Sequence, residues 1–432
     1  MKSLRIFSVL IGDIAMLSGS FFITLILRYG ENTSQELIRL HTTPFIILYT
    51  LWIVIFYIFN LYEIHSIKPN FISIKNILLA LITSGIMGFL MFYFIPYFGI
   101  TPKTTMILNV GIFGGLFILW RTLYYHLFAY RFQKTIAIIG ISTESELLVD
   151  EINRNRHAGY KYVGNFESLS EMKNQGVSPD IIVLGRALTT HELMELSEIN
   201  ADIIRIMEAF QKMFFKIPVS LINDASATKI IEQEESHLYK ITRRIIDCVF
   251  ALTVIILTLP ITLITSLAIL IEDGQPILLR QKRVGRRKKV FNIYKFRSMI
   301  VLSADGSAEN AGAKWADQND SRVTKVGRII RKLHVDEIPQ MINILKGDIA
   351  LVGPRPERPE FISKLEESIP YYFLRQTIKP GFTGWAQIKF RYARTELDSK
   401  EKFEYDLYYI RNKNFFFDIG IILKTIQIIF TH

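Results

Sequence analysis

Residues 332–360 carry the densest set of side chains suited to chemistry in this chain. Two adjacent carboxylates, Asp336 and Glu337, stand just before Pro339, a residue that the first turn of a helix tolerates. We therefore predict that the carboxylate pair lies where a helix begins. Arg355 follows between two prolines, which stiffen its backbone. A carboxylate near guanidinium groups stays ionised and can act as a nucleophile or a Mg²⁺ ligand, while the cations bind phosphate. The set predicts phosphoryl transfer.

A structural role for the same carboxylate pair is the alternative. An acidic residue at the start of a helix accepts backbone N–H bonds and complements the helix dipole. Capping accounts for one carboxylate, but it does not account for the cations Arg328, Arg331 and Lys332 that precede the pair. From these residues alone, catalysis and capping both stay open.

Three further side chains are candidates outside this segment. Lys295 and Arg297 end a predicted strand over residues 290–296, where they are either nucleotide or phosphate contacts or solubilising charges at a strand edge. Asp406 is either a metal or substrate ligand or a residue of a helix surface. No histidine and cysteine cluster has the spacing of a zinc site.

The composition indicates an integral membrane protein. Half of the 432 residues are apolar, 21% are charged, and the mean hydropathy is positive. The net charge of +11 fits a basic cytoplasmic face and phosphate-rich ligands, and we expect no nucleic-acid partner. The single cysteine, Cys248, excludes an internal disulfide framework.

Four apolar segments open the chain, and each is long enough to cross a bilayer core. They cover residues 6–27, 44–61, 74–98 and 106–128. Lysine and arginine are concentrated before the first segment, between the second and third, and after the fourth, which places both ends of the bundle in the cytoplasm. We therefore expect a four-helix transmembrane region over residues 1–130.

A soluble domain is expected over residues 131–238. Buried strands predicted at residues 135–139, 180–184 and 201–206 alternate with helical patterns, which is typical of a small parallel α/β sheet. Its first turn resembles that of a Rossmann domain, but the positions of the G-x-G-x-x-G fingerprint hold Gly140, Ser142 and Ser145. We expect a Rossmann-like domain with a structural or regulatory role and without a dinucleotide.

An apolar, uncharged run at residues 248–271 contains Pro260 at its middle. Arg243 and Arg244 flank one end and a basic run at residues 280–289 follows the other, so both ends favour the cytoplasm. A proline removes a backbone donor and bends a helix. We predict a re-entrant helix over residues 243–271 that anchors a C-terminal α/β catalytic domain, residues 239–432, to one leaflet.

Several linked motifs of this last domain resemble the bacterial sugar transferase family, the polyprenyl-phosphate hexose-1-phosphate transferases. The matching pieces are the proline-broken hairpin, RQKRVGRRKKVFNIYKFRSM (280–299), SRVTKVGRIIRKLHVDEIPQMINILKGDIALVGPRPE (321–357), KPGFTGWAQI (379–388) and YDLYYI (405–410). The leading helices and the Rossmann-like domain resemble the larger members of the family, in which that part is not needed for the chemistry.

The resemblance implies an activity and roles for the candidate residues. A UDP-sugar would donate sugar-1-phosphate to undecaprenyl phosphate and release UMP, as the first membrane step of exopolysaccharide, capsule or O-antigen assembly. Asp336 would attack the sugar-linked phosphate and carry a phosphosugar intermediate. Glu337 would act as a base or help to place Mg²⁺, the expected cofactor. Arg331 and Arg355 would bind phosphate.

The resemblance also implies a location and an oligomeric state, and it has one departure. We expect the bacterial inner membrane, with the catalytic domain on the cytoplasmic face, and homodimers are compatible with the family. After GWAQ the family commonly continues with Val-Asn-Gly-Arg, whereas Ile388, Lys389, Phe390 and Arg391 follow here. Arg391 keeps its place as a candidate phosphate contact, but the donor sugar of well-known members does not carry over.

Two other functions compete with this interpretation. A membrane-anchored nucleotide-sugar dehydratase or epimerase would need an intact glycine loop, which residues 140–145 lack. A non-catalytic scaffold for glycan assembly would use the Asp336–Glu337 pair only as a helix cap and would tolerate asparagine at residue 336.

Overall fold

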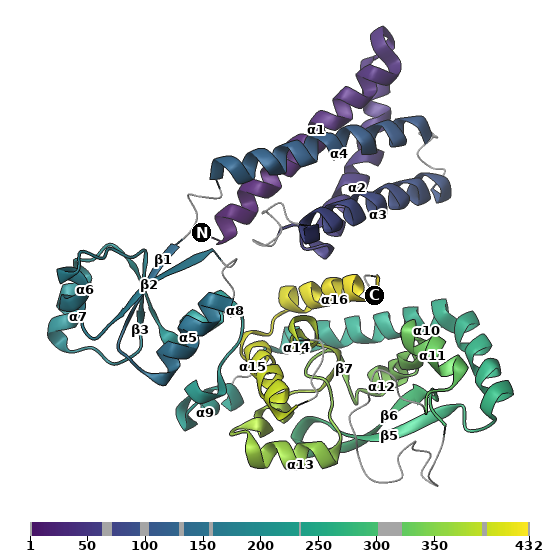
Figure 1. Cartoon of the computed structure of the whole chain (residues 1–432). Helices are drawn as coiled ribbons and strands as arrows, with labels where there is room; N and C mark the ends of the chain where they lie inside the picture. Colours follow the sequence, from purple (N-terminus) through teal and green to yellow (C-terminus); the bar gives the residue numbers. More distant parts are fainter. Residues whose placement is uncertain are drawn as a thin grey trace. The chain divides into compact units, whose positions relative to one another are not determined.

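The structure is a computed structural model that describes residues 2–62, 71–95, 103–128, 134–154, 159–232, 235–300, 322–390 and 395–430. The chain divides into two compact units, Met1–Ile206 and Met207–His432, and helices dominate both of them (Figure 1). The domain limits expected at residues 130 and 238 stay a prediction.

The first unit opens with long apolar helices. These are α1 (Lys2–Tyr29), α2 (Gln35–Ile58), α3 (Phe71–Phe94) and α4 (Lys103–Phe128), joined after α1 by a 3-10 turn, η1 (Gly30–Asn32). Together with α10 (His237–Asp273), they are the five helices in the described residues that are long and apolar enough to cross a membrane, which indicates a membrane protein.

Helix α2 begins earlier than the apolar pattern indicated. The predicted segment started at residue 44, but Ser34 caps the helix by accepting a hydrogen bond from the Leu37 amide at 3.2 Å. Pro44 therefore lies inside the helix. Hydropathy missed the polar first turns because it registers apolarity and not capping.

A charged pair is buried inside this helical bundle. Arg121 on α4 lies 2.7 Å from Asp13 on α1, and its guanidinium also donates to the carbonyl of Leu61 at 2.7 Å. Both side chains are almost inaccessible. Because an isolated charge is costly in an apolar environment, the pair fixes how α1 and α4 face each other.

A four-stranded parallel sheet follows in the first unit, in the order β2-β1-β3-β4. Its elements are β1 (Lys134–Ile139), α5 (Thr143–Arg154), β2 (Tyr160–Phe166), α6 (Leu169–Asn174), β3 (Ile181–Leu184), α7 (Thr190–Ser197) and β4 (Asp202–Arg205). The three predicted strands are confirmed as β1, β3 and β4. The sequence did not reveal β2, because it lies at an edge and alternates exposed with half-buried residues.

The first turn of this sheet is closed by its own side chains. Gly140 has a φ of +98°, as expected of the surviving glycine of the fingerprint. The Ser142 amide donates to the Ser145 hydroxyl at 2.9 Å, and that hydroxyl donates back to the Ser142 carbonyl at 2.7 Å. A donor that a Rossmann loop would offer to a pyrophosphate is therefore used locally.

The second unit holds the remaining elements. A 3-10 turn, η6 (Val219–Leu221), separates α8 (Ile206–Phe214) from α9 (Asp224–Glu232), and α10 follows. The antiparallel pair β5 (Leu278–Val284) and β6 (Val290–Phe296) turns through η7 (Arg286–Lys288). Beyond them come α11 (Lys325–Lys332), η8 (Val335–Glu337), α12 (Gln340–Lys346), β7 (Ala350–Val352), α13 (Pro359–Ser368), η9 (Tyr372–Thr377), β8 (Gly381–Thr383), α14 (Trp385–Lys389), α15 (Glu396–Asn412) and α16 (Phe415–Phe430).

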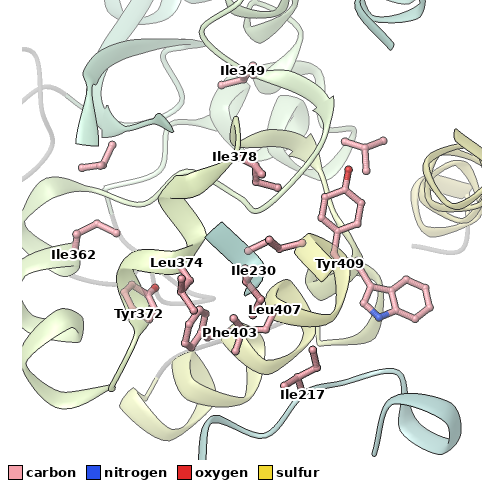
Figure 2. Close-up of a cluster of buried hydrophobic side chains, with 14 of the residues drawn as sticks. Ile217, Ile230, Ile349, Ile362, Tyr372, Leu374, Ile378, Phe403, Leu407 and Tyr409 are labelled. Carbon is pink, nitrogen blue, oxygen red and sulfur yellow. The ribbon is translucent and has the colours of Figure 1, made fainter. Parts of the chain in front are cut away.

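The core of the second unit is built mainly by helices around the short parallel pair β7–β8. Figure 2 shows Phe403, Leu407 and Tyr409 of α15 together with Tyr372 and Leu374 of η9 in one buried cluster. This packing fixes η9 against α15. The expected C-terminal α/β domain is therefore a helical domain with two small sheets.

Helix α10 runs unbroken through Pro260 and is bonded at both ends to the second unit. The Arg244 guanidinium donates to the carbonyls of Ile344 and Leu345 at 2.6 Å. Near the other end, Glu272 accepts the amides of Lys325 and Val326 at 2.8 and 2.9 Å. Between these ends the helix exposes a long apolar face, which includes Ile256, Leu257, Leu263, Ile264 and Leu267.

A buried carboxyl on α15 should make the stability of this unit depend on pH. Glu404 accepts the Val219 amide at 3.2 Å, and the Lys216 amine lies 3.9 Å away. Burial raises the pKa of Glu404 from 4.5 to about 7, although Lys216 opposes the shift. Its protonated form is therefore favoured by folding. The stability that the protonated Glu404 side chain contributes is complete below pH 4.5 and is lost as the pH rises through about 7.

We expect Glu404→Gln to remove this loss, because the amide keeps an acceptor for Val219 and carries no charge. The variant should match the wild type at the acidic end of that window and exceed it at the alkaline end by on the order of 2 kcal/mol. Thermal unfolding across the window measures the difference. Glu401→Gln is the control, since Glu401 contacts the same lysine at 3.7 Å but is 40% exposed. Parallel pH profiles for wild type and Glu404→Gln would contradict the assignment.

Candidate active site

The two candidate carboxylates lie on η8, in a tight connection between α11 and α12. His334 takes a left-handed conformation with a φ of 55° and ends the helical path of α11. The helix that we expected to begin at the carboxylate pair is preceded there by a 3-10 turn, and α12 follows. Pro339 explains the break, because it has no amide hydrogen to donate to the carbonyl of Val335. Asp336 and Glu337 therefore stand before the helix and not inside it.

Glu337 is the paired member of the two carboxylates. Its Oε1 accepts from Lys295 Nζ at 3.0 Å and from Arg355 Nη2 at 2.6 Å. Burial would raise the pKa of Glu337, but the charges of Arg355 and Lys295 hold that pKa well below its usual range. Glu337 is thus a fixed anion that joins β6 to the loop after β7.

Asp336 has a different environment from its neighbour. It is half-buried, and it forms no hydrogen bond or ion pair within the residues that the structure describes. Burial raises the pKa of Asp336 and the Glu337 charge adds to the shift, while Lys295 opposes it. An unpaired, partly desolvated carboxylate is more reactive than one held by two cations. The pair is therefore divided into one structural anion and one available oxygen nucleophile or ligand.

Arg355 is positioned through the backbone of its own loop. Each carbonyl of the Pro-Arg-Pro turn accepts a hydrogen bond from a different element: Pro354 from the Gly381 amide at 2.9 Å, Arg355 from Arg375 Nη2 at 3.1 Å, and Pro356 from Arg283 Nη1 at 3.0 Å. Since three successive carbonyls of the turn are hydrogen-bonded, the backbone that carries the Arg355 guanidinium is held in place relative to Glu337.

Asp406 lies behind this turn, in a buried ion pair. Its Oδ2 accepts from Arg375 Nε at 2.8 Å, and the two side chains are 1% and 5% exposed. The alternative that placed Asp406 on a helix surface is therefore wrong: α15 turns this residue toward the core, where Arg375 compensates its charge. Burial raises the pKa of Asp406, and the Arg375 charge opposes that shift. Through Arg375, Asp406 supports the carbonyl of Arg355.

The other predicted residues are placed as follows. Arg331 lies in the last turn of α11, and its charge opposes the rise in the pKa of Asp336. Its guanidinium forms no ion pair or hydrogen bond in the described part of the chain. Arg297 is buried. It forms an ion pair with Asp273 at 3.1 Å and donates a hydrogen bond to the Gly274 carbonyl at 2.7 Å, so it connects the end of β6 to the end of α10. Arg391 lies outside the described residues.

Asn343 on α12 is a positioning residue that sequence reasoning missed. It is completely buried; its Oδ1 accepts the Tyr294 amide at 3.0 Å and its Nδ2 donates to the Asn292 carbonyl at 2.7 Å. These bonds attach β6, and with it Lys295, to α12, the helix that follows the Asp336–Glu337 pair, which we call the dyad. A polar amide between apolar residues in QMINIL was the available signal.

The donor set also bears on the expected metal ion. Among the described residues, no group of three or more His, Cys, Asp and Glu side chains could hold a metal by itself. Mg²⁺ commonly uses only one or two carboxylates and completes its coordination with substrate phosphates and water. Asp336, with its oxygens unpaired, and Glu337 fit that kind of site.

The second unit resembles proteins of a known family. The family model for bacterial sugar transferases matches residues 238–432. An uncharacterized sugar transferase of Bacillus subtilis is 37% identical over 187 residues, which cover 43% of this chain and 86% of that protein. The chain belongs to the bacterial sugar transferase family, as its motifs predicted.

Two longer relatives have more specific names. The UDP-N-acetylgalactosamine-undecaprenyl-phosphate N-acetylgalactosaminephosphotransferase of Aeromonas hydrophila is 42% identical over 196 residues, 45% of each chain. The UDP-glucose:undecaprenyl-phosphate glucose-1-phosphate transferase of Escherichia coli K12 is 29% identical over 321 residues, 68% of this chain and 67% of the relative. The match to the Aeromonas protein thus spans less than half of its length.

Proposed function

We propose that this protein transfers sugar-1-phosphate from a UDP-sugar to undecaprenyl phosphate and releases UMP. The observation that carries the proposal is the difference between the two carboxylates: Asp336 forms no hydrogen bond or ion pair among the described residues, while Glu337 is held by Lys295 and Arg355. The names of the Aeromonas and Escherichia relatives support the same substrates. A dehydratase or epimerase is not favoured, because the match falls on the sugar transferase domain and the glycine loop is incomplete.

The reaction divides into two displacements at the same phosphorus. An oxygen of Asp336 attacks the sugar-linked phosphorus, the bond to the UMP oxygen breaks, and the electron pair leaves with UMP. An oxygen of undecaprenyl phosphate then attacks the phosphosugar-enzyme, releasing the Asp336 carboxylate and forming the lipid-linked sugar diphosphate. Arg331 and Arg355 take up charge on the phosphate oxygens. Arg391, Lys295 and Arg297 were candidates for the same task, and of these Lys295 lies at the dyad.

The proposed task of Glu337 follows from its two cations. With a pKa held well below its usual range, it is a weak base at neutral pH. We assign it to holding Lys295 and Arg355 in place and to sharing Mg²⁺ with Asp336. Bound Mg²⁺ would neutralise charge on the diphosphate of the donor.

We expect Glu337→Gln to lower the rate of UMP release by about a hundredfold, because the amide leaves Lys295 and Arg355 without an anion that orients them. Steady-state kinetics measure the loss, with Glu360→Gln as a matched exposed control. A variant that kept its full rate but needed more Mg²⁺ would reduce Glu337 to a metal ligand.

The proposal includes a membrane arrangement. Four N-terminal helices would cross the bacterial inner membrane. Helix α10, which is continuous through Pro260, would bend at that residue and dip into one leaflet, so that both its ends and the rest of the second unit stay on the cytoplasmic face. The apolar face of α10 and the bonding of both its ends to the same unit support this arrangement. If straight, the 37-residue helix would be about 55 Å long, more than a bilayer core needs.

Labelling with a membrane-impermeant maleimide tests this topology. Single cysteines at Lys240, in the first turn of α10, and at Lys282, after the helix, are introduced into a Cys248→Ala background. Both should react in inverted vesicles and be protected in right-side-out ones. Reaction of the two positions from opposite sides would show that α10 crosses the membrane.

The activity test is UMP release from a panel of UDP-sugars by purified protein with undecaprenyl phosphate and Mg²⁺. Lipid-dependent UMP from one sugar would support the proposal and identify the donor. No UMP from any sugar with a folded protein would favour the scaffold. Sedimentation of the same preparation tests the homodimer that the resemblance permits.

A further inference from the structure

A second cationic pocket lies in the same unit, where the β5–β6 turn meets the end of α12. It has a cavity volume of about 300 Å³, and its polar lining comes from Arg286, Arg287, Lys289, Asp348 and Lys379. Four cations thus face one carboxylate. Asp348 accepts a hydrogen bond from Asn343 at 3.1 Å and forms no ion pair with any of the four cations among the described residues.

The charges of these four cations are left without ion pairs in the part of the chain that the structure describes. Within the described residues, none of Arg286, Arg287, Lys289 and Lys379 forms an ion pair, and Arg286 donates only to the carbonyl of Thr377 at 3.1 Å. Burial and then the charge of Arg244 lower the pKa of Lys379, while the charge of Asp247 opposes the shift, so the surroundings of Lys379 disfavour its charged form. An arrangement of uncompensated like charges is stabilised by a bound anion.

The backbone beside this pocket is strained at two adjacent residues. Arg287 and Lys288 adopt successive left-handed conformations with φ of 54° and 60°, positions where glycine or asparagine is the usual choice. Backbone strain of this kind gathers at binding sites. Gly347, with a φ of +81°, leaves the end of α12 open beside the Lys379 amine.

The pocket is separate from the dyad. Lys289 precedes β6 and Lys295 lies near its other end, so the strand separates them by about 20 Å. Likewise, Asp336 and Glu337 precede α12, whereas Gly347 follows it. A ligand in this pocket does not occupy the site of transfer.

We propose that this pocket binds the phosphate group of an anionic phospholipid headgroup. The position of Arg244 favours a lipid as the source of the phosphate. Its guanidinium lies beside Gly347, which lines the pocket. In the sequence, Arg244 comes just before the exposed apolar face of α10, which includes Ile245 and Val249. Where an apolar helix enters a bilayer, adjacent basic residues lie at headgroup depth. The inference needs α10 to be membrane-inserted but does not depend on the transfer reaction.

The test measures thermal unfolding of the full-length protein in neutral detergent, titrated with phosphatidylglycerol, phosphatidylcholine or inorganic phosphate. The triple variant Arg287→Gln, Lys289→Gln, Lys379→Gln removes three charges from the pocket. The matched control Lys282→Gln, Lys288→Gln, Lys364→Gln removes three charges from outside it. Lys379→Gln alone serves as a second variant if the triple variant does not fold.

Phosphatidylglycerol should raise the Tm of the wild type and of the control above the value in phosphatidylcholine, and the pocket variant should lose at least half of that rise. An equal rise with inorganic phosphate, lost in the same variant, would keep the phosphate site but assign it to a soluble ligand. A pocket variant that responds to both additives as the wild type does would overturn the proposal.

Discussion

Asp336→Asn is expected to lower UMP release by at least about a thousandfold, because an amide cannot replace the attacking carboxylate oxygen. The substitution keeps the size of the side chain, and asparagine serves as well as aspartate at the start of a helix. Asp336 also has no hydrogen bond to lose in the described part of the structure. The fold should therefore survive, so that the loss reports on chemistry.

Three measurements separate the outcomes for Asp336→Asn. Donor labelled in the phosphate next to the sugar should label the wild-type protein in the absence of undecaprenyl phosphate and should leave the variant unlabelled. The melting temperature of the variant should stay near that of the wild type. Asp224→Asn, which changes an exposed carboxylate bonded to Tyr371, is the control that keeps full activity. UMP release that persists in Asp336→Asn would remove the nucleophile assigned here but not the enzyme.

The dyad was predictable because its members are neighbours in the sequence, but its division of labour was not. Glu337 meets Lys295 and Arg355 across 42 and 18 residues of chain, and only the packing of β6 and the loop after β7 brings these cations to it. The sequence placed arginines near both carboxylates without a means to decide which oxygen they bind. Burial and ion pairing depend on the tertiary structure. Burial raises the pKa of Asp336, whereas pairing with two cations lowers the pKa of the adjacent Glu337.

The residues that hold the backbone around the site in place were missed for a related reason. Arg375 lies outside the quoted motifs, and Arg283 and Asn343 lie inside them without a pattern that assigns them a role. Each acts by bonding a backbone carbonyl or amide of a distant element. Asp406 was found as a candidate but was given a metal or a surface role. Its helix is polar overall, so the pattern did not identify the face that turns inward. The apolar helices and the buried strands were predictable, because their periodicity and length report burial directly.

Asp406→Asn should lower the free energy of unfolding by about 3 kcal/mol, since it leaves the Arg375 guanidinium buried without its anion. Thermal or denaturant unfolding measures the loss. Glu366→Gln, which breaks the more exposed pair with Lys288, should change stability by less than about 1 kcal/mol. A metal ligand would behave otherwise: Asp406→Asn would then raise the Mg²⁺ requirement and leave unfolding unchanged.

A double variant separates stability from positioning. Arg375→Met with Asp406→Leu replaces the buried ion pair by apolar groups, so it should recover much of the stability that Asp406→Asn loses. It should not recover UMP release, because the Arg355 carbonyl still lacks the donor that Arg375 supplies at 3.1 Å. The expected result is a stable protein with a reduced kcat. If activity returned together with stability, the pair would serve only the core, and Arg355 would be positioned by the bonds at Pro354 and Pro356 alone.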